Sequence, residues 1–261
     1  MPVRTSYLQG TPNWVDLQTT DQAGAKAFYE GLFGWTFNDL PMPDGAVYSM
    51  ADLGDEQVAA IAPQSPELAA AGAPPMWNTY LAVDSVDDAA GQVEAAGGQV
   101  AMAPFDITDA GRMAFVLDPG GAAVALWQAN KHIGATLVNE PGTVMWNELI
   151  TSNSAAPKFY ERVLGMTTAP MDDPTMGPYT LFMVNGEMVG GTTAPQSAGE
   201  PSRWHVYFAV ADADAAAAKI AELGGTVLAG PFDTPVGRMA VAADPQDAAF
   251  SIIQPPAGQP G

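Results

Sequence analysis

The segment Trp14-Val-Asp-Leu-Gln-Thr-Thr-Asp21, followed by Phe28-Tyr-Glu-Gly-Leu-Phe-Gly34, recurs in the second half of the chain. The second copy reads Trp146-Asn-Glu-Leu-Ile-Thr-Ser-Asn153, followed by Phe159-Tyr-Glu-Arg-Val-Leu-Gly165. The copies lie about 131 residues apart, which is half of the 261-residue chain. Two segments that share apolar and polar positions in this way predict two structural units of the same kind.

Three further blocks recur in the same order, so the repeat extends over nearly the whole chain. They pair Trp77–Val83 with Trp204–Val210, Pro104–Ala114 with Pro231–Ala240, and Asp118-Pro119 with Asp244-Pro245. Blocks that keep one order in both halves indicate a duplicated sequence.

Each half divides again into two units, in which a strand and a helix precede several strands. In the first unit, residues 12–19 predict a strand, and Asp21 is placed to cap the helix that follows. Apolar residues recur along that helix at helical spacing, and Gly34 ends it. Strands are then expected at Val47–Ala51 and Gln57–Ala62, and a surface connection at Pro63–Pro75.

The second unit and the second half follow the same plan. Predicted helices span Val86–Ala96, ended by Gly97-Gly98, and Asp214–Leu223, capped by Asp212. The strands expected in the second unit span residues 77–83, 99–103, 112–117 and 122–128. The chain therefore predicts an α+β fold of four βαβββ units in two domains. We place the N-terminal domain at residues 1–130, a linker at 131–143 and the C-terminal domain at 144–261.

The composition excludes several classes of function. The chain has 9 basic and 29 acidic side chains, a net charge of −20, two histidines and no cysteine. So few cations argue against nucleic-acid and anionic-membrane partners. Disulfides, thiolate metal sites and three-histidine metal sites are impossible with this inventory. A folded chain is expected, since 48% of the residues are apolar and 15% are charged.

We expect a cytoplasmic protein, monomeric or homodimeric, whose partner is a small-molecule ligand. The sequence has no run of about 18 uncharged apolar residues and no apolar secretion-signal core near its start. Unconventional export stays open as an alternative.

Four βαβββ units in two pairs resemble the vicinal oxygen chelate superfamily, which includes glyoxalase I, extradiol dioxygenases and bleomycin-binding proteins. The resemblance rests on the helix ends Phe28–Gly34 and Phe159–Gly165, and on the Asp-Pro turn before the last strand of each half. The segments Gly10–Asp21 and Trp127–Ala135 are similar to an actinobacterial two-domain subgroup. The resemblance implies two glyoxalase-fold domains, each with a cleft inside a curved sheet.

In that superfamily, four inward-facing strand positions of a cleft supply metal ligands, usually His, Gln or Glu. The resemblance places these positions on Trp14, Asn78, Ala125 and Ala60 in the first half, and on Trp146, His205, Ser251 and Gly191 in the second. Trp, Ala and Gly offer a divalent cation no side-chain donor. We therefore expect no metal cofactor. The alternative is a divalent metal near Glu148 and His205, held by shifted ligands.

Asp16 and Glu148 are the first catalytic candidates. Each follows a Trp by two residues, which places it on the concave face of its strand. A carboxylate on an apolar strand is costly unless it has a partner or a function. With a raised pKa it can remove a proton next to a carbonyl. The structural alternative is a buried hydrogen-bond acceptor.

The two histidines are assigned different roles. His205 occupies a cleft-facing position and is the third catalytic candidate, as a general base or a ligand anchor. His132 lies in the linker, where we favour a structural role.

Aromatic side chains with a few polar anchors suit a small-molecule cleft. The candidates for ligand binding are Trp14, Gln18, Asn78, Tyr80, Arg112, Trp146, Tyr207 and Arg238. Arg112 and Arg238 follow a glycine in equivalent blocks and are candidates to clamp an anionic ligand. The alternative is an ion pair with Asp106 and Asp233 of the same blocks.

The main functional hypothesis is a protein that binds a small carbonyl-bearing or aromatic molecule in a cleft. If it is an enzyme, the resemblance implies a lyase or isomerase that acts by proton abstraction without the usual metal site. One alternative is a non-catalytic protein that sequesters a drug or metabolite, as bleomycin-resistance proteins do. The other is a metal-dependent dioxygenase or hydroxylase with shifted ligands.

Overall fold

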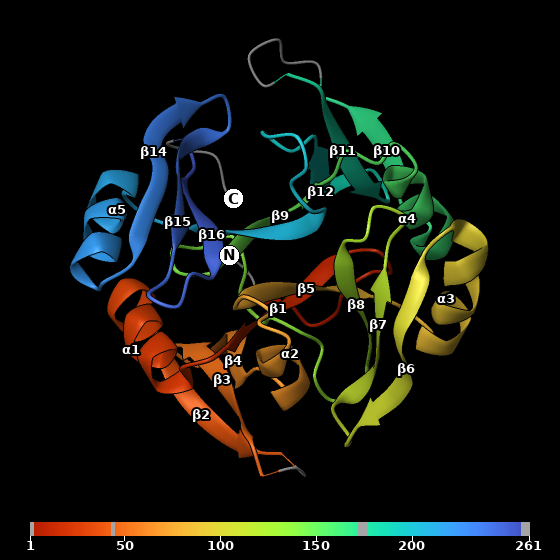
Figure 1. Cartoon of the computed structure of the whole chain (residues 1–261), viewed down its shortest axis with the longest axis horizontal. Helices are drawn as coiled ribbons and strands as arrows, with labels where there is room; N and C mark the ends of the chain where they lie inside the picture. Colours follow the sequence, from red (N-terminus) through yellow and green to blue (C-terminus); the bar gives the residue numbers. More distant parts are fainter. Residues whose placement is uncertain (1–2, 43–44, 172–176, 257–261) are drawn as a thin grey trace.

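Two eight-stranded sheets form the protein, with helices on their outer sides (Figure 1). The computed structural model describes residues 3–42, 45–171 and 177–256. The α+β fold predicted from the repeat is confirmed. The first sheet runs from Pro12 to Ala129 and the second from Val144 to Gln254.

The first sheet has the order β2-β3-β4-β1-β5-β8-β7-β6. Its strands are β1 (Pro12–Thr19), β2 (Thr36–Pro41), β3 (Val47–Leu53), β4 (Glu56–Pro63), β5 (Met76–Ala82), β6 (Gln99–Ile107), β7 (Gly111–Leu117) and β8 (Ala123–Ala129). Each βαβββ unit supplies four adjacent strands. The two units join where β1 and β5 pair antiparallel.

The second sheet repeats this order as β10-β11-β12-β9-β13-β16-β15-β14. Its strands are β9 (Val144–Ile150), β10 (Thr167–Pro170), β11 (Tyr179–Val184), β12 (Glu187–Thr193), β13 (Arg203–Ala209), β14 (Thr226–Thr234), β15 (Gly237–Ala243) and β16 (Ala249–Gln254). The helices are α1 (Gln22–Phe33), α2 (Pro66–Ala70), α3 (Val86–Val93) with a 3-10 turn at Glu94–Ala96, α4 (Ala156–Leu164) and α5 (Ala213–Glu222).

The predicted helix signals act as expected. The Asp21 carboxylate accepts a hydrogen bond from the Gly24 N–H at 2.9 Å and caps α1. Gly34 ends the helix with φ +74°, a left-handed conformation that glycine adopts readily. Asp212 caps α5 in the same way.

Two elements were not predicted. β2 is an edge strand whose side chains are mostly exposed, so the apolar alternation that indicates a strand is absent there. The five-residue helix α2 lies inside the Pro63–Pro75 segment, which was expected to be a plain connection. The Ser65 side chain accepts a hydrogen bond from the Leu68 N–H and so caps this helix. A serine, which is a preferred N-cap residue, was the signal for the helix in the sequence.

Each of the two large cores contains residues of both halves. One core joins α1 and the first unit to α5 and the fourth unit, with Phe28, Tyr29, Phe208 and Phe250 in it. The other joins α3 and the second unit to α4 and the third unit. The helix-covered faces of the two sheets therefore pack together in two cores that both halves build.

None of the helices in the described part of the chain is long and apolar enough to cross a membrane.

The segment between the sheets packs against the concave face of the first sheet. The Ala135 N–H donates to the Asn13 carbonyl at 2.7 Å, and the Thr136 N–H donates to the Gln57 carbonyl at 2.8 Å. Ala135 and Val138 join a third apolar cluster, which holds Trp14 and other residues of that face. The first cleft is thus filled by the chain itself.

Candidate functional site

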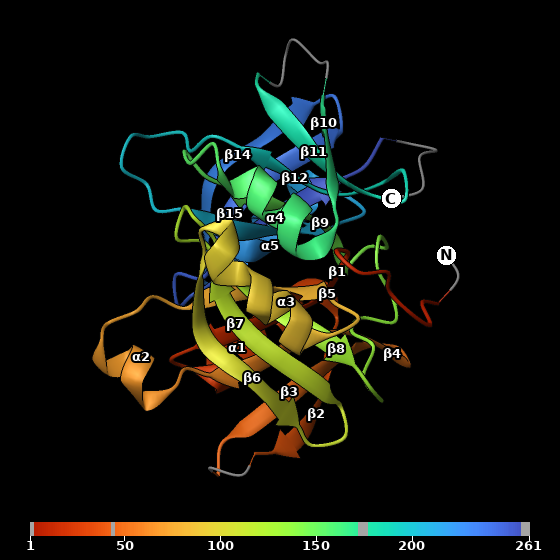
Figure 2. The same ribbon diagram turned by 90° about the vertical axis from the view of Figure 1, so that its right-hand side faces the viewer.

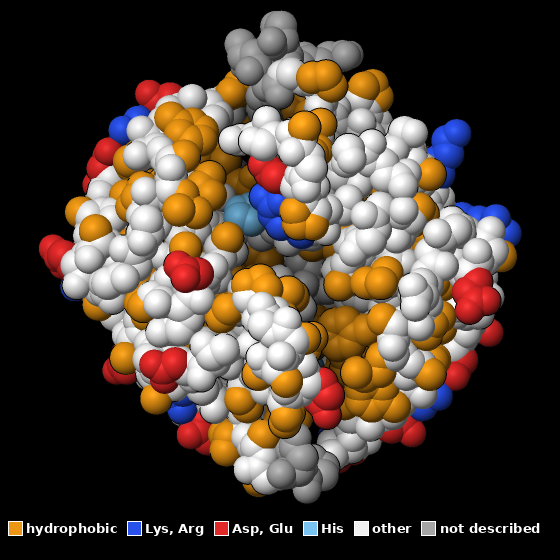
Figure 3. Space-filling model, in the orientation of Figure 1, with side chains coloured by type: hydrophobic (Ala, Val, Ile, Leu, Met, Phe, Trp, Pro, Cys, Tyr) orange, Lys and Arg blue, Asp and Glu red, His pale blue; other side chains and the backbone are white. Residues whose placement is uncertain are grey.

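The second sheet keeps a cavity of about 880 Å³ on its concave side. In the orientation of Figure 1, the surface is hollowed between the two halves of the second sheet, and apolar side chains lie along the left rim of the hollow (Figure 3). Trp146, Glu148, Tyr179 and Tyr207 line the cavity, together with four methionines. These are Met145, Met171, Met188 and Met239. This volume is in the range of pockets that bury a drug-sized molecule.

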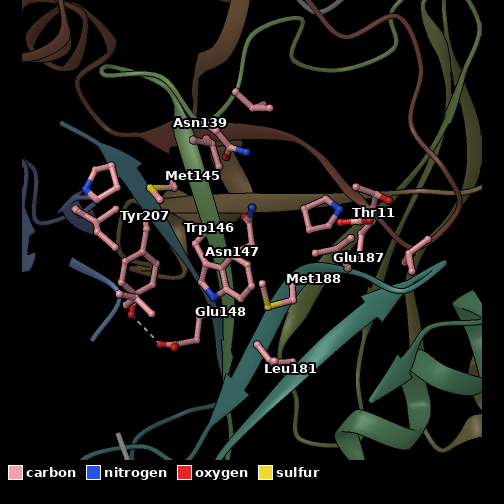
Figure 4. Close-up of a pocket in the computed structure, with 18 of the residues that line it drawn as sticks. Thr11, Asn139, Met145, Trp146, Asn147, Glu148, Leu181, Glu187, Met188 and Tyr207 are labelled. Atoms are coloured by element: carbon pink, nitrogen blue, oxygen red, sulfur yellow. Dashed lines mark hydrogen bonds between the residues drawn. The ribbon is translucent and has the colours of Figure 1, made fainter. Parts of the chain in front are cut away.

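Glu148 stands at the centre of a hydrogen-bonded aromatic group in this cavity. The Tyr207 hydroxyl donates to Glu148 Oε2 at 2.8 Å, and the two side chains face each other beside Trp146 (Figure 4). The Tyr179 hydroxyl also bonds the carboxylate, and Trp146 Nε1 donates to Tyr179 at 2.8 Å. Tyr179 on β11 and Tyr207 on β13 thus hold the Glu148 carboxylate in one position.

Burial sets the electrostatics of this group. It raises the pKa of the Glu148 carboxyl, while the bonds from Tyr207 and Tyr179 and the charge of Arg203 act in the opposite direction. Burial, with the nearby carboxylate, raises the pKa of Tyr207 well above its usual value. A carboxyl with a raised pKa that also borders a cavity has the properties of a general base.

The first half contains the same arrangement in closed form. Tyr80 and Tyr48 donate to Asp16 Oδ2 at 2.6 and 3.2 Å, and Trp14 Nε1 donates to Tyr48 at 2.9 Å. Asn78 adds a third donor to Asp16, at 2.8 Å. Asp16 is 2% exposed and lines neither of the two pockets described in this structure. The geometry corresponds to the buried-acceptor alternative for Asp16.

His205 lies beside Glu148 and not across the cleft from it. The two residues are directly paired in the β9–β13 ladder, which puts their side chains on one face. His205 Nε2 is 2.8 Å from Ser251 Oγ, and the ring does not line the cavity. Burial lowers the pKa of His205 to about 4.

Arg112 and Arg238 lie outside the cavity, on the helix side of their strands. Arg112 forms ion pairs with Asp87 at 2.8 Å and Asp106 at 2.9 Å. Arg238 repeats this with Asp214 at 2.7 Å and Asp233 at 2.9 Å. The structure therefore corrects the prediction that these two arginines clamp a ligand in the cavity, and their ion pairs with Asp106 and Asp233 match the alternative. Strand alternation explains the placement, because the inward side chains of these strands are their neighbours, the two methionines of the Gly-Arg-Met blocks.

The remaining candidates divide by cleft. Trp146, Glu148 and Tyr207 come together in the cavity. Trp14, Asn78 and Tyr80 come together around Asp16 in the filled first cleft, on the strands that also carry Gln18. The structure thus brings one predicted set to a cavity and the other to a core.

Sequence reasoning missed the wall of the cavity that comes from the first half. Residues 3–11, here called the N-terminal arm, place Arg4, Tyr7 and Leu8 in the cavity lining. The Arg4 N–H donates to the Thr136 carbonyl at 2.8 Å, and the Tyr7 hydroxyl donates to the Ala135 carbonyl at 2.5 Å. The signal in the sequence was a basic and an aromatic residue, Arg4 and Tyr7, before the first strand. The arm has no hydrophobic periodicity that would predict where it packs.

The donor set does not fit the metal that the superfamily usually holds. Of the four ligand positions in the second cleft, Trp146 and Gly191 offer no donor, and the remaining two, His205 and Ser251, bond each other. Among the residues that the structure describes, no group of three or more His, Asp or Glu side chains is placed to hold a metal ion.

Comparisons with known proteins agree on one family. Residues 11–126 match the model of the Glyoxalase/Bleomycin resistance protein/Dioxygenase superfamily, and residues 150–253 match that of a Glyoxalase-like domain. The chain is 57% identical over 258 residues to "Putative glyoxylase CFP32" of Mycobacterium tuberculosis, covering 98% of each chain. It is 38% identical to Anthracycline biosynthesis protein DnrV of Streptomyces peucetius, covering 98% of this chain and 97% of DnrV.

A solved structure has the same fold. The Mn(II)-bound glyoxalase from Novosphingobium aromaticivorans superposes with a TM-score of 0.64 at 18% identity. The match covers 95% of this chain and 83% of that chain.

Proposed function

The chain belongs to the Glyoxalase/Bleomycin resistance protein/Dioxygenase superfamily, and from this premise we propose that its second cleft binds a carbonyl-bearing or aromatic small molecule, on which Glu148 acts as a base. The reaction class is that of a lyase or isomerase. The observation that carries the proposal is a carboxyl with a raised pKa that borders a cavity of about 880 Å³.

The proposed step is proton abstraction next to the carbonyl. Glu148 takes the proton, the C–H electron pair moves to form an enolate, and the carbonyl oxygen gains the charge. If the deprotonated carbon carries a hydroxyl, that hydroxyl passes its proton to the enolate oxygen and becomes the new carbonyl, and Glu148 returns its proton to the former carbonyl carbon, which completes an isomerisation. If the next carbon carries a leaving group, the enolate re-forms the carbonyl–alkene system and expels that group with its bonding electrons, which completes an elimination. Tyr207 and Tyr179 hold the carboxylate in place during this step, since both hydroxyls bond it.

The names of the relatives are consistent with this class. One relative carries the name glyoxylase, and another is named for the biosynthesis of anthracyclines. Carbonyl chemistry on a molecule with an aromatic part fits both names and fits the aromatic lining of the cavity.

A second candidate function is sequestration without turnover. The methionine and aromatic walls of the cavity favour it, because such walls bind apolar molecules without any catalytic group. No specific contact favours an oxygenase with shifted ligands, since His205 Nε2 bonds Ser251.

The test is turnover of the hemithioacetal of methylglyoxal and glutathione, a probe with an acidic C–H beside a carbonyl. We expect Glu148→Gln to lower kcat by roughly 10²- to 10⁴-fold, the usual contribution of a general base. Glu187→Gln is the matched control, since Glu187 lines the same cavity but takes no part in the hydrogen bonds described above. It should keep kcat within about twofold.

Two outcomes separate the candidates. Equal turnover by wild type and Glu148→Gln removes Glu148 from the role of base. A retained small molecule in native mass spectrometry, with no product from wild type, favours sequestration.

A further inference from the structure

We propose that Tyr179 is a second catalytic residue of the second cleft, whose hydroxyl donates a hydrogen bond to the ligand oxygen that becomes negative when Glu148 takes a proton. Gly191 is the positioning residue that makes room for it. The inference rests on the function proposed above and names the group that stabilises the enolate. Proton removal next to a carbonyl needs such a donor, because the enolate oxygen gains its charge inside a largely apolar cavity.

The Tyr179 side chain lies directly on the backbone of β12. Gly191 on β12 is paired with Leu181 of β11 on one side and with Glu148 of β9 on the other. A Cβ atom on Gly191 would lie 2.2 Å from the Tyr179 hydroxyl oxygen, far inside van der Waals contact. The phenol therefore occupies the space that any side chain at Gly191 would need, next to the strand position of Glu148.

The surroundings of Tyr179 prepare its hydroxyl as a donor. The oxygen accepts a hydrogen bond from Trp146 Nε1 at 2.8 Å, which polarises the O–H group and strengthens the bond that it donates. Burial raises the pKa of Tyr179, so the phenol keeps its proton at neutral pH. The side chain is 8% exposed and lines the cavity, where a ligand can reach it.

The negative charge moves from Glu148 to the ligand oxygen during the step. Until then the Tyr179 hydroxyl is turned to the Glu148 carboxylate. Afterwards Glu148 is a neutral acid, and the ligand oxygen is the stronger acceptor. No proton leaves Tyr179 in this exchange, since only its hydrogen bond changes partner. Tyr207 keeps its bond to Glu148 Oε2 at 2.8 Å and holds the acid in place.

Other donors in the described part of the chain are less suited to this role. Trp146 Nε1 is already bonded to Tyr179, and His205 does not line the cavity. Thr11 and Asn139 lie apart from Glu148 in the close-up (Figure 4). The Tyr179 hydroxyl is therefore the donor that can turn from the base to the ligand.

The first half contains the same pair of positions without a cavity. Tyr48 is the counterpart of Tyr179, and Ala60 carries the methyl group that Gly191 lacks at the same place in the ladder. The Tyr48 hydroxyl donates to the Asp16 carboxylate at 3.2 Å. Tyr48 lines neither of the two described pockets, so its hydroxyl serves a buried acceptor. Tyr48→Phe is therefore a matched control for Tyr179→Phe.

The test measures binding of a stable enolate to a variant that imitates the protonated acid. Glu148→Gln carries a neutral group of nearly the same shape. The probe is the anion of 2-hydroxy-1,4-naphthoquinone, an aromatic enolate, and its neutral partner is the 2-methoxy ether. Neither quinone is trapped by a thiol, since the chain has no cysteine. In the Glu148→Gln background, Tyr179→Phe should weaken enolate binding about tenfold and ether binding less than about twofold, because the donor serves the charged oxygen.

Further variants separate this hydrogen bond from a general disturbance of the cleft. In the same background, Gly191→Ala should reproduce the loss, since the methyl group displaces the phenol, and combining it with Tyr179→Phe should add little. Tyr48→Phe should leave the affinity for both probes within about twofold. In the otherwise unchanged chain, Tyr179→Phe should lower kcat for the hemithioacetal by roughly 10²- to 10³-fold, the usual contribution of one such donor.

Each outcome decides the inference. Equal enolate affinity with and without Tyr179→Phe overturns it, and an equal loss for the ether does so too, because that indicates a structural role. Failure of the enolate to bind Glu148→Gln also overturns it. Turnover that Glu148→Gln lowers and Tyr179→Phe does not removes Tyr179 and leaves the base. If enolate binding depends on Tyr179 but wild type has no turnover, the enolate donor stands and the proposed catalysis fails.

Discussion

His132 is held in the filled first cleft with a buried Nε2 atom that has no hydrogen-bond partner among the described residues. Its ring lies edge-on to Trp14, with centroids 4.6 Å apart, and Nδ1 is 3.2 Å from the Gln57 side-chain oxygen. A structural role, as favoured from the sequence, suits these contacts. Protonation would place a charge and an unpaired N–H in an apolar site.

The consequence is a loss of stability in acid. Burial lowers the pKa of His132 to about 4 from its usual 6.5, so the unfolded chain takes up the proton first as pH falls. The stabilisation is complete above pH 6.5 and is lost progressively toward pH 4. Between pH 7.5 and 5.0, His132 should account for roughly 2 kcal/mol of the loss in unfolding free energy.

Chemical denaturation of His132→Gln at both pH values measures this share. The variant should lose less stability than wild type by about that amount. Lys131→Gln is the control, since the adjacent Lys131 is exposed and pairs with Asp109. An unchanged pH dependence in His132→Gln would show that the histidine does not titrate between the two states.

The N-terminal arm forms part of the cavity wall as an element, because its backbone bonds to Thr136 and Ala82 hold it in place. Arg4 has no carboxylate within ion-pair distance among the described residues, and its guanidinium lies 6.0 Å from the centre of the Tyr7 ring. The other charged side chains in the cavity lining, Glu148 and Glu187, are acidic. An acceptor or anionic group of a ligand would therefore turn toward the arm.

Two matched fluorescent probes measure this preference. 1-Anilinonaphthalene-8-sulfonate and N-phenyl-1-naphthylamine differ by one sulfonate, and wild type should favour the sulfonate. We expect Arg4→Gln to weaken binding of the sulfonate about three- to tenfold and to leave the neutral probe unchanged. Arg162→Gln is the control, since Arg162 lies on α4 and bonds the Ala95 carbonyl. Equal effects on both probes would contradict a charge-specific contact.

At the scale of the whole molecule, the halves are held together by a pair of matched buried contacts. The Tyr29 hydroxyl of the first half donates to Asp244 of the second at 3.2 Å, and Tyr160 of the second donates to Asp118 of the first at 3.1 Å. Each tyrosine also accepts from a buried tryptophan. The repeated helix-end and Asp-Pro motifs thus bind each other across the two halves.

We therefore expect the chain to unfold as one cooperative unit. Tyr29→Phe and Tyr160→Phe should each cost about 1–3 kcal/mol, because each leaves two buried polar groups without this partner. Calorimetry should give one transition for wild type and for both variants. Two separate transitions, or stable folded fragments of residues 1–130 or 131–261, would contradict a shared core.

Strand alternation was enough to predict from the sequence which side chains lie on the inner faces of the central strands. It placed Glu148 with Trp146, and Tyr207 with His205, on the inner face, since a strand has a strict period of two. It could not say which cleft is hollow. That depends on the path of residues 131–143, whose composition is that of a linker and whose docking has no periodic signal. Nor could alternation say that Arg112 would meet Asp87, because helix and strand contacts are tertiary.

Both described ends of the chain contribute to the lining of the cavity. Arg4 lies in its lining from one end, and Pro255 and Pro256 from the other, on the side of the molecule away from α2 (Figure 2). An affinity tag joined close to Arg4 or Pro256 would therefore start beside the lining and compete with a ligand for the cavity. The same position is useful for detection, because a dye attached there would report occupancy through its fluorescence without any change inside the cleft.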